Sequence, residues 1–156
     1  MIAPPVFSIK NPQIRGMSMG FWKKLFGKKD GGDKNSKWNA MWEMWDAGEI
    51  NSPYNELLTY DSEIQNGGHL QFFLNRALRN ENIFSVMSAL RETLPAGHAD
   101  NVAQAYRQYC MLDIDTENDA EVMQALTHDP LAAFDRYYDE HEEELLDVLE
   151  AFAETI

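Results

Sequence analysis

The sequence lacks lysine beyond Lys37, and this absence divides the chain into two parts of opposite charge. Residues 1–37 hold seven lysines and Arg15 against two aspartates, a net charge of +6. Residues 38–156 hold five arginines against 24 acidic residues, a net charge of −19. A body this acidic repels nucleic acid and anionic lipid and attracts basic protein surfaces. We therefore expect a basic extension over 1–37, an acidic domain over 38–156, and no direct nucleic-acid binding by the domain.

Other absences exclude further classes of protein. Cys110 is the single cysteine, which excludes an intrachain disulfide and a cluster of thiolate metal ligands. Its place on an apolar helical face predicts a buried, unreactive side chain. No apolar run approaches the roughly 18 residues that span a bilayer, and no apolar stretch after a basic start marks a signal peptide. We expect a cytoplasmic protein.

Strand patterns are also missing, because no segment alternates between polar and apolar residues and β-branched residues are few. The pattern predicts one compact all-α domain. Expected helical segments are 38–48, 52–68, 70–78, 80–95, 102–110, 116–126 and a long final stretch from 129. Ser52, Asn80 and Thr116 are the expected helix-capping residues. In the fourth segment we expect Ile83, Phe84, Met87 and Leu90 to point inward.

The basic extension contains one amphipathic segment, 20–29. Its apolar residues fall on one helical face and its lysines lie largely on the other: Phe21, Trp22, Leu25 and Phe26 against Lys23, Lys24 and Lys28. Such a segment suits weak contact with an anionic membrane or with the acidic body of the chain itself. A soluble basic leader is the alternative interpretation.

No motif in the chain indicates an enzyme. Asp113, Asp115, Glu117 and Asp119 resemble the start of a calcium loop, but the glycine and glutamate that such a loop requires are replaced by Asn118 and Gln124. A solvated, capped turn is the expected structure there. His69, His98, His128 and His141 show no metal-ligand spacing. We expect no catalytic residues, no metal and no cofactor, with a hydrolase or metalloenzyme as a minor alternative.

The final stretch carries the strongest charge pattern. Leu145, Val148, Leu149 and Phe152 are spaced as its buried side, and a row of acids advances by three or four residues on the outward side: Asp139, Glu143, Asp147, Glu150 and Glu154. Like charges at this spacing cost helix stability, so their presence indicates selection for negative potential. We expect a partner-binding acidic surface formed by this row together with Glu140, Glu144, Asp113, Asp115, Glu117 and Asp119.

One internal segment resembles a known signature. The sequence Glu63-Ile-Gln-Asn-Gly-Gly-His-Leu-Gln-Phe-Phe-Leu-Asn75 is similar to that of a bacterial DNA-mimic family (DNA mimic protein 19-like), first catalogued as a domain of unknown function. The matching residues are Glu63, Asn66, Gly67, Gly68, Gln71, Phe72, Phe73 and Asn75. His69 departs from the pattern, because an aromatic residue is usual at that position. The similarity extends from about Tyr54 to Cys110.

The motif also has a physical interpretation as a structural corner. We expect Gly67 to adopt a left-handed turn that ends one helix and Gly68 to allow the next helix to approach closely. Asn66 and Gln71 can satisfy backbone groups freed at the junction, and Phe72 and Phe73 are predicted to fill the core.

The resemblance implies an acidic, helical, dimeric protein whose surface imitates duplex DNA. Its partner would be a basic DNA-binding protein such as a helix-turn-helix transcription regulator. One alternative is an immunity or antitoxin protein that neutralises a basic toxin or nuclease. A second alternative is an acidic structural or salt-adapted domain without a specific partner. The acids that would imitate DNA lie outside the shared motif.

Overall fold

The computed structural model describes residues 33–156, and every regular element in this range is an α-helix. The predicted all-α fold is confirmed. The amphipathic segment 20–29 lies outside the described residues. The helices are α2 (Asp33–Asp46), α3 (Tyr54–Leu78), α4 (Ile83–Thr93), α5 (Ala96–Leu112), α6 (Asp119–His128), α7 (Ala132–Glu140) and α8 (Glu142–Ala153).

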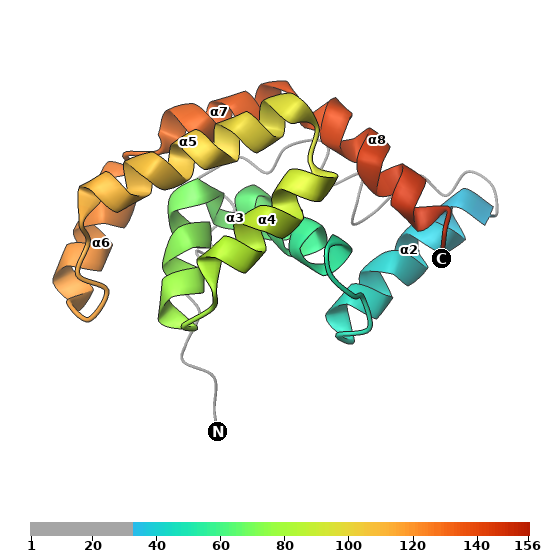
Figure 1. The fold of residues 1–156 in the computed structure, drawn as a ribbon, viewed down its shortest axis with the longest axis horizontal. Coiled ribbons are helices and arrows are strands. Elements are labelled where there is room, and N and C mark those ends of the chain that lie inside the picture. Colours follow the sequence, from blue (N-terminus) through green and yellow to red (C-terminus); the bar gives the residue numbers. More distant parts are fainter. Residues whose placement is uncertain (1–32) are drawn as a thin grey trace.

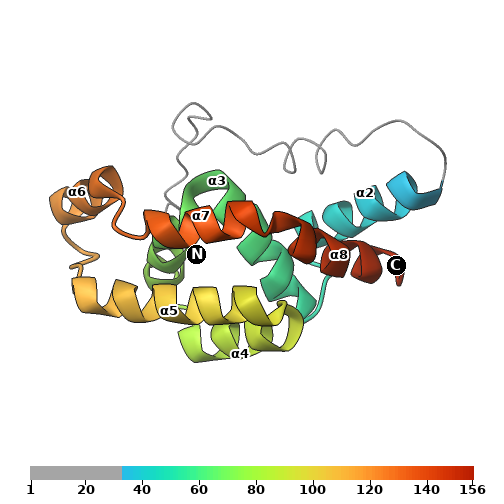
Figure 2. The same ribbon diagram turned by 90° about the horizontal axis from the view of Figure 1, so that it is seen from above.

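The helices are arranged around α3, which crosses the middle of the molecule (Figure 1). α4 and α7 pack on α3, and α5 lies beside α7. α2 and α8 pack against each other at one end of the molecule, whereas α6 lies at the opposite end in both views (Figures 1 and 2). The acidic helices α6, α7 and α8 therefore follow the long axis of the fold.

The core is built on α3 because this helix is buried over most of its second half. Tyr60, Ile64, Phe72 and Leu74 are completely buried, and Phe73 is 1% exposed. Leu90 from α4, Val102 from α5, Tyr138 from α7, and Leu145 and Leu149 from α8 complete the same cluster. The prediction that Phe72 and Phe73 fill the core is confirmed, as is the buried side of the final helix.

The helix caps differ from the prediction at three places. Asn82, not Asn80, caps α4: its side-chain oxygen accepts hydrogen bonds from the backbone N–H groups of Phe84 and Ser85. Asn80 instead has a left-handed backbone (φ 57°) just after α3. An N-cap needs an extended backbone, which Asn82 has. Asn118 replaces Thr116 at α6 for the same reason. Pro53 precedes α3, and no side chain caps that helix.

Two apolar positions are exposed where the sequence predicted burial. Phe84 is 77% exposed, because the inner face of α4 is formed by Val86, Ala89 and Leu90, which lie on the opposite side of the helix from it. Cys110 is also exposed, because Ala105, Tyr106 and Tyr109 supply the inner face of α5.

The long final stretch is two helices rather than one. His141 (φ −117°, ψ 20°) separates α7 from α8. Its ring stacks on Tyr137 with centroids 4.0 Å apart, and its Nδ1 lies 2.9 Å from the carbonyl oxygen of Tyr137. The backbone N–H of His141 still donates to the carbonyl oxygens of Tyr137 (3.1 Å) and Tyr138 (3.2 Å), so the helix breaks through the non-helical backbone angles of His141 and not through a lost hydrogen bond.

Candidate protein-binding surface

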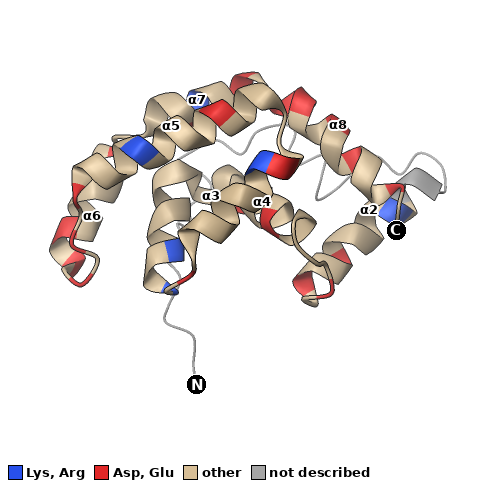
Figure 3. Ribbon diagram, in the orientation of Figure 1, with Lys and Arg blue, Asp and Glu red and all other residues tan. Residues whose placement is uncertain are grey.

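The predicted acidic residues all lie on the outside of the molecule. We call the eleven of them the acidic surface: Asp113, Asp115, Glu117, Asp119, Asp139, Glu140, Glu143, Glu144, Asp147, Glu150 and Glu154 are each exposed. Figure 3 shows acidic positions along α6, α7 and α8, with Arg136 the one basic residue after residue 112. Because so few cations are interspersed, the negative potential of these side chains is not neutralised locally.

Besides Glu144, the α8 part of this surface is a row of four carboxylates, Glu143, Asp147, Glu150 and, just past the last residue of the helix, Glu154. At about 1.5 Å rise per residue, the row places one charge every ~6 Å of helix axis. One DNA strand has a charge every ~3.4 Å, so the row has roughly half that density. Asp139 belongs to α7, and the break at His141 separates it from the row, contrary to the single-helix prediction.

The dipole of α8 favours acids at one end of the helix and disfavours them at the other. Glu142, Glu143 and Glu144 occupy the first turn, where carboxylates are stabilised. Glu154 lies at the unfavourable C-terminal end, and there the Nζ of Lys37 approaches both its carbonyl oxygen (3.1 Å) and its carboxylate (3.5 Å). The last lysine of the basic extension is therefore in contact with the last acid of the row.

The acids between α5 and α6 form the predicted turn. Asp113 ends α5 with a left-handed backbone, and Asp115 Oδ1 accepts a hydrogen bond from the N–H of Glu117. Glu121 accepts one from the N–H of Asp115. Within residues 33–156, no three histidine, cysteine or acidic side chains are placed to hold a metal ion.

The family-motif corner is a kink within α3. Gly68 has φ 82° and ψ −179°, outside helical values, whereas the motif residues on either side are helical. This corrects the predicted roles: Gly68, not Gly67, carries the positive φ. At Gly67 the close neighbour is the side chain of Gln71, whose Oε1 would lie 2.0 Å from an added Cβ.

Glu63 joins the two arms of the kink. Its carboxylate accepts hydrogen bonds from Asn75 Nδ2 and Arg76 Nη2. Arg76 also lies over the Phe72 ring, 4.9 Å from its centroid, and pairs with Glu81. Burial raises the pKa of Glu63, and the charge of Arg76 opposes this shift. These contacts fix the angle between the arms, as expected of a structural corner.

A buried chain of polar groups runs from the kink to α7. Asp135 Oδ1 accepts hydrogen bonds from the backbone N–H of His69 (2.8 Å) and from His69 Nδ1 (2.6 Å). On the other side of the ring, Nε2 lies 2.8 Å from the Tyr60 hydroxyl. A neutral imidazole with its proton on Nδ1 satisfies both contacts, since the Tyr60 hydroxyl then donates to Nε2.

A second polar chain lies beside the first. The Tyr138 hydroxyl donates to Asp61, and Gln65 Nε2 donates to the Tyr138 oxygen (3.1 Å) and to Glu142 (2.7 Å). Burial raises the pKa of Tyr60 well above its usual value, with a further contribution from the charges of Asp135 and Asp61. Burial and Asp61 do the same for the pKa of Tyr138. Both phenols are therefore protonated donors at neutral pH.

These two chains are structural, because their central side chains have almost no access to solvent and only Glu142, at the end of the second chain, is partly exposed. Tyr60, Asp61 and His69 are 0% exposed and Asp135 is 3% exposed. Sequence reasoning missed this network and counted Asp61 and Asp135 with the surface charge. The unusual histidine at position 69 was the one available signal, since a histidine at an apolar helical position needs buried partners.

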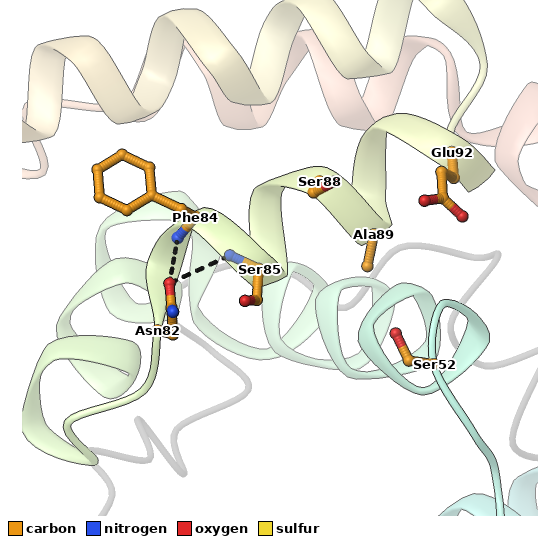
Figure 4. A pocket seen from close by; sticks show the side chains of 7 residues that line it. All are labelled: Ser52, Asn82, Phe84, Ser85, Ser88, Ala89 and Glu92. Atoms are coloured by element: carbon orange, nitrogen blue, oxygen red, sulfur yellow. Dashed lines mark hydrogen bonds between the residues drawn. The ribbon is translucent and has the colours of Figure 1, made fainter.

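One pocket of about 450 Å³ lies away from the acidic surface, along α4. Its lining residues are Ser52, Asn82, Phe84, Ser85, Ser88, Ala89 and Glu92. Figure 4 shows the Asn82 oxygen bonded to the backbone of Phe84 and Ser85 at the pocket edge. No residue of the acidic surface or of the motif lines this pocket.

Comparison with known proteins agrees with the motif. The family model of the DMP19-like proteins matches residues 55–156, from the first turn of α3 to the last residue. The chain belongs to the DMP19-like protein family. No curated protein matches the DMP19-like chain significantly. Among solved structures there is likewise no significant match.

The family match extends beyond the resemblance seen in the sequence. The expected similarity ended near Cys110, whereas the matched range includes α6, α7 and α8. The acidic surface of this DMP19-like chain is therefore part of the family domain rather than an addition to it. None of the helices within 33–156 is both long enough and apolar enough to cross a bilayer.

We expect His98 to make the stability of this DMP19-like chain sensitive to acid. The ring is buried, its Nε2–H donates to the carbonyl oxygen of His141 (2.8 Å), and its Nδ1 has no hydrogen-bond partner among the described residues. Burial lowers the pKa of His98 from its usual value of 6.5. As the pH falls below that value, the unfolded chain takes up a proton that the folded chain resists.

We expect His98 to contribute a loss of stability below about pH 6.5, with a slope of at most ~1.4 kcal/mol per pH unit. His98→Gln keeps a donor for His141 and should remove this slope in urea unfolding between about pH 5 and 7.5. His128→Gln, on an exposed position, should retain it. The raised pKa of Glu63 makes the folded state more stable as the pH falls, which is opposite to the effect of His98. This contribution is the same in the parent and in both variants, so it cancels when their slopes are compared. Equal slopes for His98→Gln and the parent would contradict the assignment.

Proposed function

We infer that this DMP19-like chain is a non-enzymatic binding protein whose acidic surface occupies the DNA-binding surface of a basic protein. The observation that carries this proposal is the segregation of its charge. From residue 113 onward the eleven acids of the acidic surface are exposed, and this part of the chain contains one arginine and no lysine. The buried ionisable side chains Asp61, His69 and Asp135 form structural hydrogen bonds instead.

Carboxylates on this surface would meet the lysines and arginines that otherwise contact phosphates. A regulator of the helix-turn-helix type presents such side chains on the surface that faces the DNA backbone and the major groove. The α8 row has about half the charge density of one DNA strand, so imitation of a duplex requires flanking acids such as Glu140 and Glu144, or a second copy of the chain. A homodimer is accordingly part of the proposal.

Neutralising the α8 row tests the proposed surface. We expect Glu143→Gln/Asp147→Asn/Glu150→Gln to lower the association rate with the partner about tenfold or more at low salt, because long-range attraction accelerates encounter. The variant should also show a shallower salt dependence. The partner is first captured on the parent protein from lysate at low salt and released at high salt, and rates are then measured by surface plasmon resonance.

The matched control removes three exposed acids elsewhere. Glu43→Gln/Asp46→Asn/Glu49→Gln changes the net charge equally, at α2 and the turn that follows it. If the association rate falls by the same factor in both triple variants, the total charge of the protein and not the α8 row determines how fast it binds. If no basic protein is captured at low salt, the proposal fails.

Competition with duplex DNA separates the proposed mimic from an immunity protein. A DNA mimic and duplex DNA bind the same residues of the partner, so DNA should displace the chain in proportion to its concentration. A complex with a basic toxin in which DNA leaves binding unchanged would favour the immunity function instead.

A further inference from the structure

The outward face of α8 is an unpartnered helix face that begins where the basic extension ends. Glu143, Asp147 and Glu150 are exposed and form no ion pair with any residue in 33–156. Leu146, half-buried, and Ala151, exposed, flank the row on its two sides. This face therefore offers carboxylates with some apolar surface beside them.

The α2–α8 interface adjoins this face of α8. α2 packs on α8, and Lys37 already contacts Glu154, the last acid of the row. Figures 1 and 2 show the first turns of α2 next to the C-terminal end of α8. A segment just before α2 thus leaves the described structure at one end of the acidic row. As an exposed ion pair, Lys37–Glu154 adds little energy, but it fixes this starting point.

The chain before α2 is long enough to cover the row. Glu143 and Glu154 are eleven residues apart, which corresponds to about 16 Å along the helix. The ten residues 20–29 span about 15 Å if helical, and residues 30–32 add up to ~10 Å of connection. The opposite end of the molecule, where α6 lies, is separated from α2 by the length of the fold (Figure 1).

The chemistry of residues 20–29 matches the same face. Lys23, Lys24, Lys28 and Lys29 supply four positive charges against the four carboxylates of the row. Single ion pairs on such a surface contribute little, but several charges on one short segment act together.

We propose that residues 20–29 dock on the outward face of α8 of the same chain, continuing the α2–α8 interface along the acidic row. The docked segment and a basic partner then compete for the same carboxylates. The docking itself needs no partner, and only its regulatory consequence rests on the proposed function.

Paramagnetic relaxation in the full-length protein tests the docking. A nitroxide is attached at Gly20→Cys, the end of the segment farthest from α2, in a chain that also carries Cys110→Ser, since Cys110 is exposed. We expect strong broadening of backbone amide signals at 143–147, the end of the row far from α2, and none in α6. The broadening should largely disappear at about 1 M salt, where the Debye length is ~3 Å.

The matched control keeps the tether and removes the docking site. In the labelled chain, Glu143→Gln/Asp147→Asn/Glu150→Gln should reduce the broadening at 143–147 by several-fold. Equal broadening with and without these substitutions, or no broadening in either, would overturn the proposal. A mixture of nitroxide-labelled chains at natural isotope abundance with ¹⁵N-labelled chains that lack the nitroxide tests for contact between two copies. Broadening in that mixture would assign the contact to a second copy and also overturn the proposal. Because no partner is present, failure here is distinct from failure of the proposed function.

Discussion

Gly68→Ala is expected to destabilise the protein by about 3–5 kcal/mol, a large fraction of the stability of an ordinary domain. The backbone at Gly68 (φ 82°, ψ −179°) lies in a region that is essentially restricted to glycine. In addition, a Cβ there would lie 2.4 Å from Asp135 Oδ2. Either the kink or the carboxylate must move, and Asp135 then loses its hydrogen bonds to His69.

Gly48→Ala separates backbone strain from the collision with Asp135. Gly48 also has a positive φ (75°), but nothing lies within 4 Å of an added Cβ. We expect this variant to lose only about 1–2 kcal/mol, the usual cost of a left-handed backbone for alanine. The free energies of unfolding from urea titrations are compared with the parent. If the two alanine variants are destabilised equally, the close approach of Asp135 to Gly68 has no energetic consequence.

The glycine pair also shows how far sequence reasoning reaches. Two adjacent glycines between apolar helical segments predict a corner, and a corner is present. Which glycine adopts the positive φ depends on tertiary contacts, because Gly67 faces Gln71 four residues later whereas Gly68 faces Asp135 from α7. The sequence separation between residues 68 and 135 hides that contact from any local pattern.

The helix boundaries also depend partly on the local sequence and partly on tertiary contacts. Apolar spacing predicts where the helices lie, because each helix must bury one face. The caps were wrong by two residues at Asn80 and Thr116, because the backbone angles that select Asn82 and Asn118 depend on how α3 and α5 end. The non-helical backbone of His141 divides the final stretch into two helices, which spacing alone does not reveal.

The acidic surface was the most predictable part of the candidate site. Charged side chains without a buried partner stay in water, so residues such as Asp147 and Glu150 are exposed as predicted. Asp61 and Asp135 are the exceptions, since each has partners far along the chain that offset the cost of burial. Counting charges therefore overestimates the surface potential wherever a buried network includes an aspartate.

Asp135→Ala is expected to cost about 3–5 kcal/mol, because it leaves buried donors of His69 without an acceptor. Both the backbone N–H and the Nδ1–H of His69 donate to one oxygen of Asp135. Glu140→Ala, five residues later on the same helix and exposed, serves as the control and should change stability by no more than about 0.5 kcal/mol.

His69→Phe completes a double-mutant cycle with Asp135→Ala. The phenyl ring keeps the packing near Phe73 and Phe134 but removes the hydrogen bonds of the imidazole to Asp135 and Tyr60, while the backbone N–H of residue 69 remains bonded to Asp135. If the ring and the carboxylate stabilise each other, the double variant will be more stable than the sum of the single losses predicts, by about 1–3 kcal/mol. Additive losses would mean that Asp135 acts through the backbone N–H of residue 69 alone. In that case any loss in His69→Phe would come from the contact with Tyr60 and from packing, and not from the pair with Asp135.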